Sequence, residues 1–230
     1  MFSAYKHVRH MSSPTPQNRT MYLPPHFRED RIPVIHELIR AHSLATLVTM
    51  GSDGLMASHV PMLLDPQPEP FGTLRCHLAR GNPQWRSFSP DVPALAIFSG
   101  PQHYISPLWY ATTAETGKVV PTWNYAIVHA YGPLHVTEDA AWLREMVTNL
   151  TDLHEAIFPE PWTVENAPAD YIAGQLKAIV GIEMPISRLE GKWKVSQNRP
   201  EKDREGVVSG LEQMAELVKA ASRGKTEDQT

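Results

Sequence analysis

The chain has 230 residues, of which 42% are hydrophobic and 20% are charged, and its formal net charge at pH 7 is −4. A chain of this size and composition is typical of a soluble globular protein with one full-sized domain. The slightly acidic balance excludes a global basic field that would draw the protein to nucleic acid or to a membrane surface, and leaves room only for a local basic patch.

The composition of the two ends sets the expected domain limits. Residues 1–20 are polar and lack an apolar core segment, so we expect a disordered N-terminal extension rather than a secretory signal, with Met21 as an alternative start. We expect one domain over residues 21–222, including a C-terminal helix, and a frayed tail over residues 223–230.

The single cysteine and the apolar runs point to a cellular compartment. Cys76 has no second cysteine with which to form an intrachain disulfide, which suits a reducing cytoplasm. No apolar run approaches the roughly 20 residues that a membrane-spanning helix needs. We therefore expect a cytoplasmic protein without a membrane partner.

The first part of the domain predicts a helix followed by a β-hairpin. Apolar residues recur at helical spacing over residues 31–41, and residues 43–50 and 55–64 read as two strands joined by a glycine-containing turn. Pro61 lies inside the second strand, where a proline is tolerated only at a sheet edge or a bulge. Such a position leaves backbone groups free for a ligand.

The stretch Gly72–Trp85 combines a strand with a candidate anion site. It opens with the alternation of a half-buried strand, with Cys76 on the apolar side, and then breaks at Arg80-Gly81-Asn82-Pro83. Asn82 is a plausible N-cap of a short helix that begins near Pro83. Arg80 next to a helix start would attract a phosphate group. The alternative is an ordinary connection with a solvated arginine.

The second part of the chain predicts further strands and three helices. We expect strands over residues 91–99, 120–136 (bent near Gly132), 177–186 and 193–196, a polar loop over 111–119, and helices over 142–153, 171–176 and 207–218. Strands joined mostly by short turns favour a mainly β fold with peripheral helices, an antiparallel barrel, over a doubly wound sheet.

Motifs of common catalytic and metal sites are absent from the sequence. It contains no GxGxxG, Walker, HExxH or GxSxG motif, and one cysteine cannot build a cysteine-based zinc site, so we predict no metal. Eleven histidines are scattered along the chain. Of these, His59, His77 and His129 lie in predicted strands, where they would line a pocket, bind a metal or haem, or form hydrogen bonds inside the barrel.

Several longer segments, taken in order and spacing, resemble one protein family. They are MYLPPHF, ATLVT with ASHVP, HLARGNPQW, GPQHYISPLWY, VPTWNY with HAYG, and GIEMPI with KVSQNRP, and the resemblance covers roughly residues 21–215. They are similar to the PaiB-type FMN-binding negative transcriptional regulators. The resemblance implies the fold of the pyridoxamine 5′-phosphate oxidase group, an antiparallel split β-barrel that forms a homodimer and holds FMN at the subunit interface.

The same resemblance implies a set of cofactor-binding residues. Residues after the third strand would bind the flavin phosphate, and the strand before them would face the isoalloxazine ring. Two later motifs would reach the same site or that of the dimer partner. The implied residues are Arg80, Asn82 and Gln84 with His77 for the phosphate, Ala57, Ser58, His59 and Val60 for the ring, and Trp123, Asn124, Lys194, Ser196 and Gln197 from the later motifs.

Three functions stay open at this point. The first is an FMN-binding regulator that represses transcription, either directly or indirectly. No helix-turn-helix motif occurs and the basic segment 199–204 is interrupted by acids, which makes direct DNA binding doubtful. The second is an FMN-dependent oxidoreductase that acts on a small molecule, with His59, Tyr125 or His129 as acid or base. The third and weakest is a haem-binding split barrel.

Overall fold

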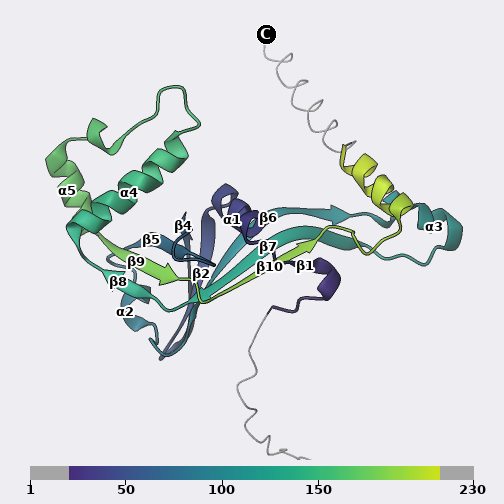
Figure 1. Cartoon of the computed structure of the whole chain (residues 1–230), viewed down its shortest axis with the longest axis horizontal. Helices are drawn as coiled ribbons and strands as arrows, with labels where there is room; N and C mark the ends of the chain where they lie inside the picture. Colours follow the sequence, from purple (N-terminus) through teal and green to yellow (C-terminus); the bar gives the residue numbers. More distant parts are fainter. Residues whose placement is uncertain (1–20, 213–230) are drawn as a thin grey trace, which may run out of the picture.

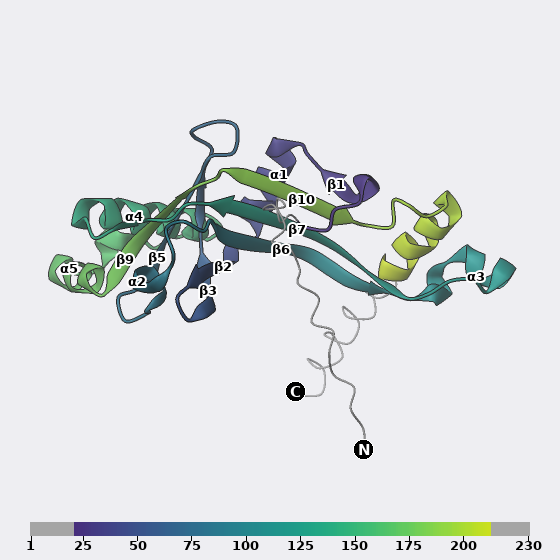
Figure 2. The same cartoon turned by 90° about the horizontal axis from the view of Figure 1, so that it is seen from below.

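The computed structural model describes residues 21–212 (Figure 1). The predicted extension over residues 1–20, the tail over 223–230 and the last part of the predicted C-terminal helix lie outside the described residues. Helices α4 (Ala140–Glu155) and α5 (Ala169–Lys177) lie at one end of the long axis. Helix α3 (Ala111–Thr116) and the helix formed by residues 201–212 lie at the other end (Figures 1 and 2).

A six-stranded antiparallel sheet, here called the large sheet, forms the body of the molecule. Its two longest strands, β6 (Ala94–Ile105) and β7 (Thr122–Gly132), run side by side from the body to the far end of the molecule and form an extended arm with β10 (Arg188–Lys194) (Figure 2). In spatial order the strands are β1 (Arg28–Glu29), β10 (Arg188–Lys194), β7 (Thr122–Gly132), β6 (Ala94–Ile105), β2 (Leu44–Gly51) and β3 (Gly54–Pro61).

A smaller antiparallel sheet of four strands packs against one end of the large sheet. Its order is β4 (Leu63–Asp65), β5 (Thr73–Ala79), β9 (Ile179–Pro185) and β8 (His135–Thr137). The chain passes from the large to the small sheet at Met62 and again after Gly132. The two sheets are not closed into one barrel, which is consistent with a split barrel and confirms the predicted mainly β, antiparallel fold class.

Helices cover the sheets from several sides. Helix α1 (Ile32–Ala41) packs on the interior, and α4 (Ala140–Glu155) packs on the outer face of the small sheet. The other elements are the short helices α2 (Gln84–Ser87), α3 (Ala111–Thr116) and α5 (Ala169–Lys177), the 3₁₀ turns η1 (Pro25–Phe27), η2 (Pro107–Trp109) and η3 (Val164–Asn166), and the helix of residues 201–212.

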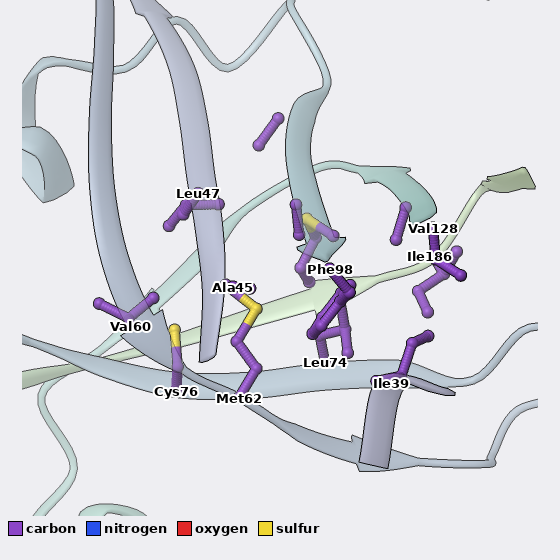
Figure 3. Close-up of a cluster of buried hydrophobic side chains, with 14 of the residues drawn as sticks. Ile39, Ala45, Leu47, Val60, Met62, Leu74, Cys76, Phe98, Val128 and Ile186 are labelled. Atoms are coloured by element: carbon purple, nitrogen blue, oxygen red, sulfur yellow. The ribbon is translucent and has the colours of Figure 1, made fainter. Parts of the chain in front are cut away.

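The main hydrophobic core lies between the two sheets and α1. Ile39 of α1, Leu47 of β2, Phe98 of β6 and Leu74 of β5 point into one interior (Figure 3), and each is at most 1% exposed. Burying side chains of this size is worth about 1.5–3 kcal/mol each, so this interior is the main source of stability. Cys76 is also 1% exposed, which confirms its predicted packing role.

The structure corrects several predicted boundaries. The predicted strand 55–64 is divided at Met62 into β3 and β4, although Pro61 does end an edge strand as predicted. The predicted loop 111–119 contains helix α3, so that prediction was wrong. The fourth predicted strand does not stop at residue 99, because β6 continues through a register shift between Ser99 and Gln102 to Ile105. The bulge there accommodates Pro101.

The predicted bend near Gly132 is confirmed, and a capping residue fixes the start of the helix that follows. The long strand predicted over residues 120–136 is bent after Gly132, where β7 ends and β8 follows. A Cβ atom at Gly132 would lie 2.1 Å from the carbonyl oxygen of Pro185, so only glycine allows this close crossing of the two sheets. Asp139 caps α4 by accepting a hydrogen bond from the Trp142 amide at 2.7 Å.

None of the helices within residues 21–212 is long and apolar enough to cross a membrane.

Candidate flavin site

The first part of the candidate site is the outer edge of β3. Because β3 is the last strand of the large sheet, its outer row of backbone groups has no strand partner among the described residues. Ala57 and His59 are exposed along this strand, whereas the side chain of Val60 is buried in the core. The His59 ring is held by a 3.0 Å hydrogen bond between its Nδ1 and Thr46 Oγ1. The edge therefore offers free backbone donors and acceptors beside a fixed imidazole.

The turn after β5 lies directly against this edge. Asn82 donates a hydrogen bond from Nδ2 to Ser58 Oγ at 2.9 Å, and its Oδ1 accepts from the Gln84 amide at 2.9 Å. The N-cap of α2 is Pro83, so the predicted N-cap residue Asn82 lies one position earlier, although its Oδ1 still accepts from the amide of the first residue of the helix. The first bond joins two segments that are 24 residues apart in sequence, so the predicted ring-facing strand and the predicted phosphate-binding turn form one continuous polar surface.

Arg80 projects from the same turn and is fixed by three acceptors. Its Nε donates to the carbonyl oxygen of Lys177 at 2.8 Å, its Nη2 donates to that of Ile179 at 3.1 Å, and its Nη1 forms an ion pair with Glu138. These contacts use three of the five guanidinium N–H groups and leave two without an acceptor among the described residues. The remaining N–H groups, one on each terminal nitrogen, belong to a positive charge that suits a phosphate, so the chemistry of this side chain suits FMN.

Gln84 lies inside the protein. Its side chain is 0% exposed, and its Nε2 donates to the carbonyl oxygen of Leu47 (3.1 Å) and to Thr49 Oγ1 (3.1 Å), with a longer contact to the carbonyl oxygen of Met56 (3.3 Å). These acceptors belong to the β2–β3 hairpin, so the amide anchors the hairpin to α2. The structure thus gives Gln84 a supporting position behind the predicted site rather than an exposed one.

His77 lies on the opposite face from the main core, beneath helix α4. It pairs across the small sheet with Gly181, and the Trp142 ring of α4 occupies the space where a Cβ atom of Gly181 would be. Burial lowers the pKa of His77, and its Nδ1 has no hydrogen-bond partner within residues 21–212.

The later motif residues gather at the far end of the arm. Asn124 and Ser196 exchange hydrogen bonds of 3.0 and 3.1 Å between their side chains, and Lys194 Nζ donates to the carbonyl oxygen of Trp123 at 2.6 Å. Burial lowers the pKa of Lys194, with smaller contributions from the nearby charges of Lys192 and Arg199.

Two further contacts complete the arm cluster. Gln197 folds back on the chain, where its Oε1 accepts from the Val195 amide at 2.8 Å and its Nε2 donates to the carbonyl oxygen of Trp193. The Trp123 ring is 53% exposed and makes an edge contact with Tyr104, at a distance of 6.1 Å between ring centroids. The arm therefore presents an exposed aromatic ring beside a polar cluster.

The structure thus brings the predicted site residues together in two separate groups. One consists of β3 with the Arg80–Asn82 turn, near α2, and the other lies at the start of β7 and the end of β10, near α3. Figures 1 and 2 show that these regions lie in different parts of the long axis in both views. Sequence reasoning missed Glu138 as the partner of Arg80, and its only sequence signal was an acidic residue near the start of α4.

Comparison with known proteins identifies the family. A family model described as "Putative FMN-binding domain" matches residues 21–188. The Bacillus subtilis "Protease synthase and sporulation protein PAI 2" is 32% identical over 86% of this chain and 96% of its own length. An uncharacterized protein of Emericella nidulans is 35% identical over 84% of this chain and 91% of its own.

Solved structures with low sequence identity support the fold. A conserved hypothetical protein from Mycobacterium tuberculosis matches with a TM-score of 0.55 at 12% identity, over 79% of this chain and 95% of that one. A FAD and heme binding protein from Mycobacterium smegmatis matches with a TM-score of 0.52 at 15% identity, over 80% of each chain. Together with the family match, these findings show that the chain belongs to the PaiB-type FMN-binding split-barrel family that its sequence motifs predicted.

Proposed function

We propose that the protein binds FMN against the outer edge of β3, with the phosphate at the Arg80–Asn82 turn. The hydrogen bond from Asn82 to Ser58 is the observation that carries this proposal, because it joins the two surfaces that a flavin ring and its phosphate would need. Arg80 would neutralise the phosphate with its two remaining N–H groups, and the backbone groups of β3 that face away from β2, which alternate along the strand, would bind the pyrimidine edge of the ring. FMN itself would supply redox chemistry or act as a sensor.

We propose further that a second copy of the chain completes each site. The outer face of the large sheet carries a row of half-buried aliphatic side chains from neighbouring strands, which include Val48, Leu95, Ile97 and Ile127. At the arm tip, Trp123 is 53% exposed and Leu108 is 84% exposed. Apolar surface of this extent favours a homodimer. The arm of one subunit would then place Trp123, Asn124, Lys194, Ser196 and Gln197 beside the flavin of the other.

The biological output that best fits these features is regulation through the flavin. Tight DNA binding without a DNA-binding motif requires clustered Lys and Arg, whereas the chain has 21 basic against 25 acidic residues. In addition, Lys202 is paired with Glu115 at 2.6 Å. We therefore expect that any repression acts through flavin chemistry or a partner protein, and that the homodimer gives no nanomolar, competitor-resistant mobility shift on its own upstream DNA.

The experiment that tests the proposal is a spectrum of the purified protein followed by titration of the apoprotein with FMN. Flavin absorbance that co-purifies, one FMN per chain at saturation, and a light-scattering mass near twice 25.8 kDa are the expected results. A haem spectrum, or an apoprotein with no measurable FMN affinity, would contradict the proposal.

A further inference from the structure

The helix of residues 201–212 is fixed to the tip of the arm and lies beyond the region that the family model matches, which ends at residue 188. Its Val207 is 4% exposed and packs in a small second core with Ile105, the last residue of β6, and Tyr110. This core is separate from the main interior between the sheets. The helix therefore stabilises the arm tip and not the body of the barrel.

Trp109 occupies a notch in this helix. A Cβ atom at Gly206 would lie 1.9 Å from the carbonyl oxygen of Trp109, and one at Gly210 would lie 2.4 Å from Cδ2 of its ring. Each glycine weakens a helix relative to alanine. Two glycines one turn apart, both against Trp109, are therefore explained by the close approach that they permit.

Polar contacts fix the same helix in one register. Asp203 is 0% exposed, and its Oδ1 accepts a 2.9 Å hydrogen bond from the amide of Thr112 at the start of α3. Lys202 forms its ion pair with Glu115 at the other end of α3. A buried carboxylate is costly unless it is bonded, so sliding or rotating the helix would be opposed by the loss of this bond.

The arm tip that the helix holds is continuous with the candidate site residues. In the register of β6 and β7, Ile105 lies opposite Thr122 and Tyr104 lies opposite Trp123. On the other side, Asn124 is bonded to Ser196, which lies on the segment that leads from β10 into the helix. A movement of the helix would therefore displace both strands that flank Trp123.

We propose that the helix of residues 201–212 is a latch that positions Trp123 and Asn124 for the flavin of the second subunit, with Trp109 as the positioning residue. This inference rests on the proposed function, and it adds a segment beyond the matched domain to the site. Opening of the latch would withdraw the ring from the flavin while the Arg80–Asn82 turn continues to hold the phosphate.

Gly206→Ala tests the latch, with Ser209→Ala on the exposed side of the same helix as the matched control. The substitution raises helix propensity, so a loss of function cannot come from a weaker helix. We expect the variant to keep its fold and its dimer, and to recover the flavin fluorescence that Trp123 quenches in the wild type. It should bind FMN roughly two- to tenfold more weakly, because one aromatic contact is lost. In a Trp123→Phe background, Gly206→Ala should change the fluorescence no further.

A second variant, Gly210→Ala, covers the case in which Gly206→Ala does not fold. Its added methyl group meets the Trp109 ring and not the backbone. In an otherwise wild-type protein the substitution should weaken the quenching of flavin fluorescence, and in a Trp109→Ala background it should have no added effect. If both variants fold and match the Ser209→Ala control in flavin quenching and in FMN affinity, the latch is refuted and the proposed function is not. A wild-type protein that binds no FMN would refute the proposed function and the latch together.

Discussion

Replacing Arg80 by alanine removes the only charged side chain that we propose to contact the FMN phosphate. The wild-type guanidinium is already held by the carbonyl oxygens of Lys177 and Ile179 and by Glu138, which leaves two N–H groups for the ligand. Because these contacts restrain the Arg80 side chain before FMN binds, ordering this side chain would cost little of the binding free energy.

The expected loss follows from this geometry. A charge-assisted contact through two N–H groups is worth about 1.5–3 kcal/mol, so Arg80→Ala should weaken FMN binding roughly 10- to 100-fold. Arg80→Lys keeps the charge but cannot donate from two separate nitrogens, and should give an intermediate loss.

The assay is a titration of apoprotein with FMN, followed by flavin fluorescence at fixed ionic strength. Arg86→Ala is the matched control, because Arg86 belongs to the adjacent helix α2 and its guanidinium lies over the Trp85 ring, 4.1 Å from the ring centroid. The control should bind FMN as the wild type does. An Arg80→Ala protein that is folded and has wild-type affinity would remove Arg80 from the site.

Three further predictions concern the fold that holds the site. Burial raises the pKa of the Cys76 thiol to about 12, so Cys76 should resist a thiol reagent in the native protein and react once urea unfolds it. Gly132→Ala would place a methyl group against the carbonyl oxygen of Pro185, and should lower the free energy of unfolding by about 1–3 kcal/mol, measured by urea titration; an unchanged midpoint would contradict the close crossing of the sheets. Burial also lowers the pKa of His36, His77 and His129 below the ordinary 6.5, so the unfolded state binds protons more readily than the folded state. The free energy of unfolding should therefore decline as the pH falls below 6.5. A melting temperature that stays constant between pH 7.5 and 5.5 would refute this prediction.

Local patterns in the sequence predicted much of the fold. The alternation in residues 74–78 assigned Cys76 to the core, and Gly132 marked the bend between two strands, because burial and backbone freedom at these positions follow from neighbouring residues. The boundary at Met62 was missed, since the passage from one sheet to the other depends on tertiary pairing, with β3 bonded to β2 and β4 bonded to β5.

The candidate site was less predictable for the same physical reason. Gln84 is a polar residue after a turn, and only its fit inside the β2–β3 hairpin explains its complete burial. His77 has the strand position that the family motif implied, but helix α4, more than 60 residues later, covers its face. The separation of Trp123 and Lys194 from Arg80 arises from the length of β6 and β7, which no local motif encodes.

The most direct test of a flavin site shared between two subunits is complementation between two defective variants. Arg80→Ala removes the phosphate contact, and Trp123→Ala removes the ring contact that the other subunit would supply. After the two purified variants exchange subunits at random, half of the dimers are mixed, and each mixed dimer has one site with neither defect. We predict that about one site in four regains wild-type FMN affinity and quenching in the mixture. A mixture that binds FMN as the average of the two variants, although mass spectrometry shows mixed dimers, would contradict the shared site.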